Sequence, residues 1–138
     1  MVSNRRRGER VPQTVLIIED EVPVLKLVTA LLRNSGREVL SAVNGAQALE
    51  IARTHEGPID MVISNVLLSG QKGPEIVREL LAMRPAVPCL FVSGFPQENP
   101  DSPELQEIRR IPSARVGFLA KPFKPAELLA AVEALSRS

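Results

Sequence analysis

Five polar side chains that could do chemistry each follow an apolar segment of this sequence. Glu19 and Asp20 come after the run Val-Leu-Ile-Ile, and Asn65, Ser93 and Lys121 each follow another apolar run. Two carboxylates, an amide, a hydroxyl and an ammonium group can together bind an ion or hold a reacting group in place. They form a single site only if the fold brings these distant segments of the chain together.

The apolar segments have the pattern of strands in a parallel β-sheet. Short runs rich in β-branched residues are typical of strands that are buried on both faces. Strands are predicted at residues 15–18, 38–42, 59–64, 87–92 and 116–120. Helical spacing of apolar residues predicts helices between Val22 and Gly36, from Asn44 to about Gly57, from Gly73 to Pro85, from Pro103 to about Ile111, and from Pro125 onward.

Strands that alternate with helices in this way predict an α/β fold with a doubly wound, five-stranded parallel sheet. Right-handed crossovers place the five helices on both faces of the sheet, which gives a three-layer α/β/α architecture. Ligands of such sheets bind beyond the carboxyl ends of the strands. We therefore expect the five polar side chains to share one rim of the sheet.

The composition excludes several other classes of protein. The 138 residues are 44% hydrophobic and 24% charged, and a net charge of +1 gives no overall attraction to nucleic acid. No apolar run is long enough to cross a bilayer, so we expect a soluble, cytoplasmic protein without membrane contact. One cysteine and one histidine exclude a disulfide framework and a multi-cysteine metal site. No phosphate loop or Gly-x-Gly-x-x-Gly motif follows the first strand, so no nucleotide-dependent enzyme is indicated.

The predicted domain organisation has two parts. Residues 1–13 carry four arginines and little apolar sequence, so we expect a disordered basic tail. Residues 14–138 contain every predicted strand and helix and form the predicted domain.

Four segments resemble the receiver domains of two-component response regulators. They are Val-Leu-Ile-Ile-Glu-Asp-Glu at 15–21, Ile-Asp-Met-Val-Ile-Ser-Asn at 59–65, Phe-Val-Ser-Gly at 91–94 and Gly-Phe-Leu-Ala-Lys-Pro-Phe at 117–123. They occur in the order of the family, each at the end of a predicted strand, and the resemblance spans about residues 14–137. It implies the flavodoxin-like fold with strand order 2-1-3-4-5.

The resemblance also implies a role for the residues of the predicted rim. In receivers an acid pair holds Mg²⁺, and an aspartate that ends the third strand takes a phosphoryl group from a kinase phosphohistidine. Glu19 and Asp20 match the acid pair, and Leu67 matches the residue whose backbone carbonyl completes the metal site. Ser93 and Lys121 match the residues that contact the phosphoryl oxygens.

Asn65 stands where the family has its phospho-accepting aspartate. A neutral amide oxygen is a poor nucleophile and forms no comparably stable phosphorylated product. Two carboxylates remain for Mg²⁺ instead of three. We therefore expect a weakened metal site made of Glu19, Asp20, Asn65 and the Leu67 carbonyl, with no tightly bound cofactor.

Two further positions bear on this replacement. Lys121 loses a charged partner at position 65, and Glu19 or Asp20 could take over that role. Ser69 stands where the family usually has proline. These observations favour a naturally divergent receiver. The alternative is an ordinary phospho-accepting receiver in which the original aspartate was deliberately replaced by Asn65.

The resemblance implies a protein-binding module of phosphorelay signalling that is not an enzyme. The expected partner is a sensor histidine kinase or another signalling protein. The expected partner surface combines the helix at 103–111, the strand at 116–120 and the last helix, with Phe118 matching the aromatic switch residue of the family. A more distant alternative is a small-ligand-binding flavodoxin-like protein, although the first strand lacks the loop that would hold a flavin phosphate.

Overall fold

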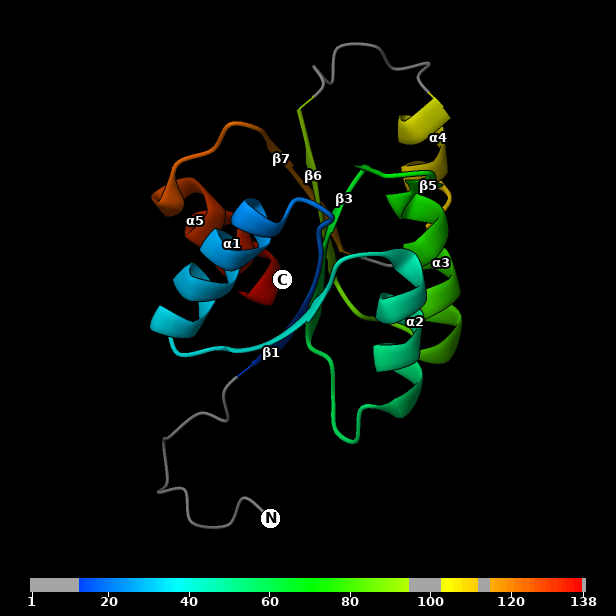
Figure 1. Ribbon diagram of the computed structural model, residues 1–138, viewed down its shortest axis with the longest axis horizontal. Helices are drawn as coiled ribbons and strands as arrows, with labels where there is room; N and C mark the ends of the chain where they lie inside the picture. The colour runs from blue at the N-terminus through cyan, green and yellow to red at the C-terminus, as the bar shows by residue number, and fades with distance from the viewer. Residues whose placement is uncertain (1–12, 95–102, 112–114, 138) are drawn as a thin grey trace.

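A parallel β-sheet forms the centre of the fold in the computed structural model, which describes residues 13–94, 103–111 and 115–137 (Figure 1). Within these ranges the five-stranded sheet has the order β2-β1-β3-β6-β7. Its strands are β1 (Thr14–Ile18), β2 (Glu38–Ala42), β3 (Met61–Asn65), β6 (Cys89–Ser93) and β7 (Val116–Ala120), and all four pairings are parallel. The predicted strand order 2-1-3-4-5 is confirmed.

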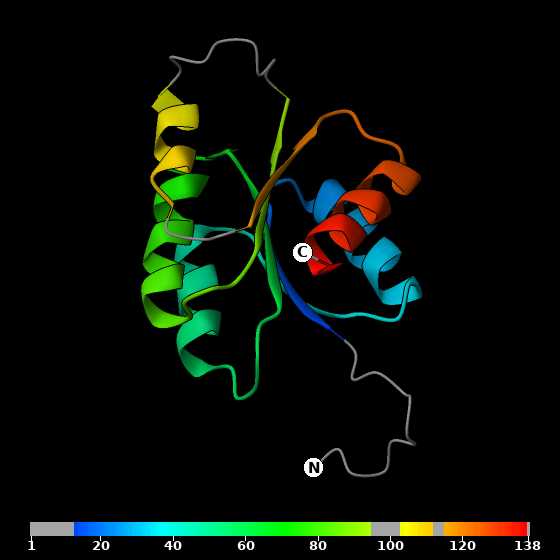
Figure 2. The same cartoon turned by 180° about the vertical axis from the view of Figure 1, so that it is seen from behind.

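Helices cover both faces of the sheet (Figures 1 and 2). The helices α1 (Val22–Asn34) and α5 (Pro125–Arg137) lie on one face. The other face carries α2 (Gly45–Thr54), α3 (Gly73–Met83) and α4 (Pro103–Arg109). The predicted three-layer α/β/α architecture is confirmed. In the part of the chain that the structure describes, none of these helices combines the length and the apolar character needed to cross a membrane.

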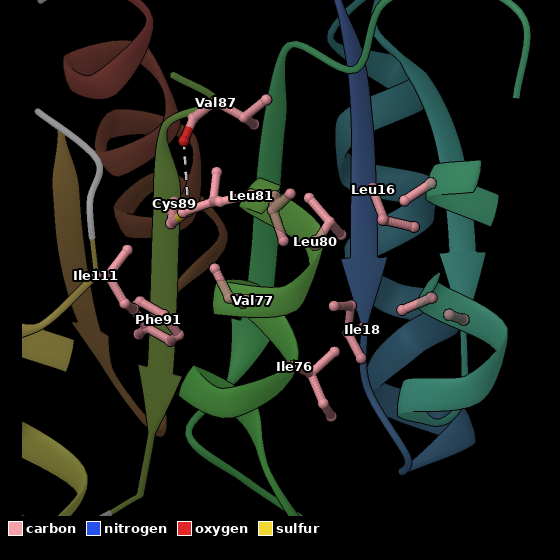
Figure 3. Packing of buried hydrophobic residues seen from close by; sticks show 14 of the residues in the cluster. Leu16, Ile18, Ile76, Val77, Leu80, Leu81, Val87, Cys89, Phe91 and Ile111 are labelled. Atoms are coloured by element: carbon pink, nitrogen blue, oxygen red, sulfur yellow. Dashed lines mark hydrogen bonds between the residues drawn. The ribbon is translucent and has the colours of Figure 1, made fainter. Parts of the chain in front are cut away.

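The core lies on both sides of the sheet because the strands are covered on both faces. Every residue of β1 is buried, and its side chains alternate between the two core clusters. Leu16 and Ile18 pack on the side of α2 and α3, and Ile18 lies near Ile76 of α3 (Figure 3). Continuous burial explains why this strand reads as an unbroken apolar run.

Two helix ends are fixed as the sequence predicts. Gly36 has a φ of +90° just beyond α1, and its N–H donates to the carbonyl of Arg33 while the N–H of Arg37 donates to that of Leu32. This pattern is a Schellman motif, which favours glycine. At the start of α2 the Oδ1 of Asn44 accepts a hydrogen bond from the backbone N–H of Gln47 at 2.8 Å.

The structure differs from the sequence-based expectation in the segment after β3 and in some element ends. The expected loop at 65–72 contains a short antiparallel hairpin of β4 (Leu67–Leu68) and β5 (Gln71–Lys72). The strands β3 and β6 each begin two residues later and end one residue later than predicted. The ladder between them extends to the pair Asn65 and Val92, and the ladder between β6 and β7 extends to the pair Ser93 and Ala120. The helix α4 ends at Arg109, two residues before its predicted end.

The predicted tail lies outside the described residues except for its last residue, Gln13. The backbone carbonyl of Gln13 accepts a hydrogen bond from the N–H of Glu38 at 2.8 Å. Its side-chain oxygen accepts bonds from Arg37 at 3.0 Å and from Ser136 at 3.1 Å. Gln13 is therefore attached to the start of β2 and to α5.

Candidate functional site

The carboxyl ends of β1, β3, β6 and β7 lie along one edge of the sheet and form the predicted rim. Backbone hydrogen bonds extend beyond the strands: Val66 donates to the carbonyl of Val92 at 3.0 Å, and Lys121 donates to that of Ser93 at 2.7 Å. The rim surrounds a cavity of about 250 Å³. Its lining residues are Asp20, Glu21, Asn65, Leu67, Leu68, Ser69, Val92, Ser93, Gly94 and Lys121.

Asn65 is buried at the end of β3, with 6% of its surface exposed. Its Nδ2 donates to Oε2 of Glu19 at 2.6 Å and lies 3.5 Å from Oδ1 of Asp20. Carboxylate oxygens only accept hydrogen bonds, so the NH₂ end of the amide is the end that suits these neighbours. The position that matches the phospho-acceptor of the family therefore presents hydrogen-bond donors to the acid pair.

Glu19 is buried, and the described contacts engage both of its carboxylate oxygens. Oε1 accepts a bond from Nζ of Lys121 at 3.2 Å, and Oε2 accepts bonds from Asn65 and from the backbone N–H of Glu21 at 3.0 Å. A buried carboxylate needs such partners to offset its lost hydration. Lys121 also lies 3.7 Å from Oε1 of Glu21. Glu19 therefore serves as a charged partner of Lys121, as the sequence predicts. The peptide bond between Lys121 and Pro122 is cis.

Asp20 is held by Ser69, which lies in the turn of the β4–β5 hairpin. Oδ2 of Asp20 accepts bonds from the Ser69 hydroxyl at 2.7 Å and from its backbone N–H at 3.0 Å. The hydroxyl bond lowers the pKa of Asp20 below its usual value, against the opposing effect of burial. Sequence reasoning noted Ser69 only as a departure from the family. Its contact with Asp20 depends on the hairpin, which the sequence pattern did not indicate.

Gly73 is a second residue whose role at the rim was missed. Its N–H donates to the carbonyl of Val66 at 2.8 Å, and a Cβ at this position would lie 1.8 Å from the backbone carbonyl oxygen of Asn65. Only glycine allows α3 to begin this close to the end of β3. The Gly-Pro pair predicted the helix start but gave no sign of this close approach.

The arrangement does not fit the ligand set of a divalent cation. Among the residues that the structure describes, no three Asp, Glu, His or Cys side chains are grouped so that they could hold a metal ion. Asn65 directs N–H donors at Glu19 and Asp20, and such donors cannot coordinate a cation. Leu67 lies at the cavity on β4. The other ligands available beside its backbone carbonyl would be the carboxylates of Glu19 and Asp20, which already accept other hydrogen bonds.

Two predicted site residues occupy different surroundings. Ser93 is buried in the wall of the cavity at the end of β6. Phe118 is half-buried on β7, does not line the cavity, and packs against the core cluster on the side of α3. Its ring centroid lies 6.5 Å from that of Phe91, with the two rings tilted by 43°. Phe118 therefore contributes to the core, and its role as a switch stays a prediction.

Solved structures of receivers share this fold. The chain is similar to the chemotaxis protein CheY4 of Vibrio cholerae, with a TM-score of 0.78 and 27% identity over 91% of this chain and 99% of that one. It is similar to the receiver domain of the hybrid histidine kinase CckA, with a TM-score of 0.71 and 31% identity over 89% of this chain and 98% of that one. The fold and the rim thus define a CheY-like receiver.

The family follows from the sequence match. Residues 15–133 match the response regulator receiver domain, and the chain belongs to this family of two-component signalling. It is 35% identical over 121 residues to the sensor kinase CckA of Brucella abortus, which is 87% of this chain and 12% of the kinase. It is 33% identical over 129 residues to the transcriptional regulatory protein PdtaR of Mycobacterium tuberculosis, which is 92% of this chain and 58% of that protein. The chain thus spans only part of the length of these relatives.

Proposed function

We propose that this receiver domain does not accept a phosphoryl group and acts as a protein-binding module in two-component signalling. The observation that carries the proposal is the Asn65 amide, whose nitrogen donates to Oε2 of Glu19 at 2.6 Å. An acyl phosphate requires an anionic carboxylate oxygen that attacks phosphorus, and an amide does not supply one. The domain would then act through binding rather than through chemistry.

The charges of the rim support the same proposal. Glu19, Asp20 and Glu21 lie around a single described ammonium group, that of Lys121, which pairs with Glu19 and Glu21. A phosphoryl group carries negative charge and would meet these carboxylates at close range. The rim therefore disfavours a phosphoryl group unless a cation offsets that repulsion.

Incubation with acetyl phosphate and Mg²⁺, followed by intact mass spectrometry, tests the proposal. We expect no phosphoryl-sized mass increase in this chain. The Asn65→Asp variant supplies a positive control, because it restores a carboxylate at the end of β3. A phosphoryl-sized increase that maps to residues 61–72 of the unaltered chain would contradict the proposal.

The contacts of the rim also bear on the origin of Asn65. Lys121 pairs with Glu19, and Ser69 holds Asp20, so the neighbours of Asn65 already have partners that do not depend on an aspartate at position 65. This arrangement supports natural divergence. The codon for residue 65 in the source gene tests it, because an aspartate codon would support the alternative of an ordinary phospho-accepting receiver.

The proposed partner surface comprises α4, β7 and α5. The strand β7 lies at the edge of the sheet and is hydrogen-bonded to β6 alone within the described residues. Its residues Val116 to Leu119 are half-buried and Ala120 is exposed, so this edge remains accessible. The proposed partner is a sensor histidine kinase.

Two variants locate the binding surface by biolayer interferometry with the purified kinase. Ala120→Arg places a long charged side chain at the end of β7, and we expect it to weaken binding by about tenfold or more. Leu27→Arg makes the same kind of change at an exposed position of α1 and should leave affinity unchanged. The reverse pattern would place the surface on α1 and contradict this proposal.

A further inference from the structure

We propose that the Asn65 amide and the Lys121 ammonium group together take the place of a divalent cation, so that the rim is closed by the protein's own groups and Mg²⁺ does not change the stability of the domain. The inference concerns the same rim as the proposed function and rests on it for its meaning in signalling. Its test uses metal without any phosphodonor, so the two proposals can fail separately.

The hydrogen bonds of the two acids carry the first step. Oε1 of Glu19 accepts from Lys121 at 3.2 Å, and Oε2 accepts from Asn65 at 2.6 Å and from the backbone of Glu21 at 3.0 Å. Oδ2 of Asp20 accepts two bonds from Ser69, at 2.7 and 3.0 Å. Oδ1 of Asp20 lies 3.5 Å from Nδ2 of Asn65, a longer contact. A cation would have to displace several of these bonds before it could coordinate.

Electrostatic repulsion carries the second step. An aspartate at position 65 would bring a carboxylate oxygen to the place of Nδ2, which lies 2.6 Å from Oε2 of Glu19. Two ionised carboxylates this close repel each other strongly when they are buried. Asparagine has nearly the same shape and changes this repulsion into a hydrogen bond. The replacement therefore removes both a cation ligand and a negative charge that a cation would offset.

The groups of the closed rim come from different parts of the fold. Glu19 follows β1, Asn65 ends β3, and Lys121 follows β7, while Ser69 belongs to the hairpin. The contacts of Glu19 and Asp20 thus join three strand ends and the hairpin through groups of the protein itself. This closed rim holds one arrangement whether or not metal is in solution.

Thermal unfolding in EDTA and in Mg²⁺ at matched ionic strength tests the inference. We expect the unaltered domain to have the same Tm in both solutions. Asn65→Asp should lose several degrees in EDTA and regain them in Mg²⁺, since Mg²⁺ binds only its folded state. Asn44→Asp makes the same chemical change at an exposed helix cap and should show no response to Mg²⁺.

A second variant covers the case in which Asn65→Asp does not fold in EDTA. Lys121→Gln keeps the hydrogen-bonding character of the side chain but removes its charge, so Glu19 loses its counter-ion. We expect this variant to gain a saturable rise in Tm with Mg²⁺. Calorimetric titration with Mg²⁺ should show no binding heat for the unaltered chain. Saturable Mg²⁺ binding or Mg²⁺-dependent stabilisation of the unaltered chain would overturn the inference. The absence of any Mg²⁺ response in Asn65→Asp and in Lys121→Gln alike would also overturn it.

Discussion

The side-chain amide of Asn65 and the carboxylate of Glu19 form a 2.6 Å hydrogen bond that joins the end of β3 to the end of β1. In the receiver family these two positions carry two acids. Here one of them is a neutral donor, and the buried carboxylate of Glu19 shares its oxygens between this donor, Lys121 and the backbone of Glu21. An amide in place of one carboxylate thus alters both the hydrogen bonding and the charge of the whole rim.

Glu19→Gln is expected to destabilise the domain by about 1–3 kcal/mol, because buried charge-assisted hydrogen bonds are lost and Lys121 keeps the more distant, exposed Glu21 as its charged partner. Urea unfolding at neutral pH measures the difference. Glu50→Gln is the matched control, since Glu50 forms an exposed pair with Arg53 on α2 and should change stability little. Equal effects of the two substitutions would show that the Glu19 contacts contribute nothing specific.

Ser69→Ala is expected to raise the pKa of Asp20 toward its ordinary value, because the Ser69 hydroxyl bond is the main cause of the lowered pKa. A lowered pKa in the folded state stabilises the protein above the ordinary pKa, and this contribution is lost as the pH falls through the lowered value. Ser69→Ala should therefore reduce the dependence of stability on pH in the acidic range. Carbon NMR titration of the Asp20 carboxyl measures the pKa directly, with Ser41→Ala as the control. An unchanged Asp20 pKa in Ser69→Ala would show that the hydroxyl does not hold this carboxylate.

Gly73→Ala is expected to cost about 3 kcal/mol or more, because its Cβ would lie 1.8 Å from the backbone carbonyl oxygen of Asn65. Backbone atoms cannot move aside as a flexible side chain does, so either α3 or the end of β3 must shift. Gly94→Ala is the control, since a Cβ there meets nothing within 4 Å. Chemical unfolding of both variants measures the costs. A Gly73→Ala variant as stable as Gly94→Ala would contradict the close approach of α3 to the rim.

Cys89 is expected to be unreactive in the folded domain. Burial in β6 raises the pKa of its thiol to about 12, so very little thiolate exists at neutral pH and reagents have no access to it. Labelling with a thiol reagent at pH 8 should be negligible in buffer and complete in denaturant. Rapid labelling of the native domain would show that β6 opens readily or that Cys89 is exposed.

The sheet and the rim could be predicted because their signals are local. Each buried strand reads as a short apolar run, and Glu19, Asn65, Ser93 and Lys121 follow such runs directly. In a parallel sheet all carboxyl ends meet at one edge, so strand ends alone place these side chains together. The family resemblance then supplied the strand order and the position of the missing aspartate.

The contacts that close the rim could not be predicted, because they depend on distances between segments. Ser69 reaches Asp20 only through the β4–β5 hairpin, whose strands are two residues each and leave little periodicity. The need for glycine at position 73 arises from the carbonyl of Asn65, which the pattern of α3 does not report. The direction of the Asn65 amide follows from its neighbours and not from its own residue type.

The side-chain amide signals of Asn65 in nitrogen–proton NMR spectra test the central claim most directly. They report the group that stands in the phospho-acceptor position, and Asn65→Asp assigns them by their disappearance. We expect these signals to stay unchanged when Mg²⁺ and acetyl phosphate are added, because the amide remains bound to Glu19. Signals that shift saturably with Mg²⁺, or that are lost on addition of the phosphodonor, would contradict a rim closed by Asn65.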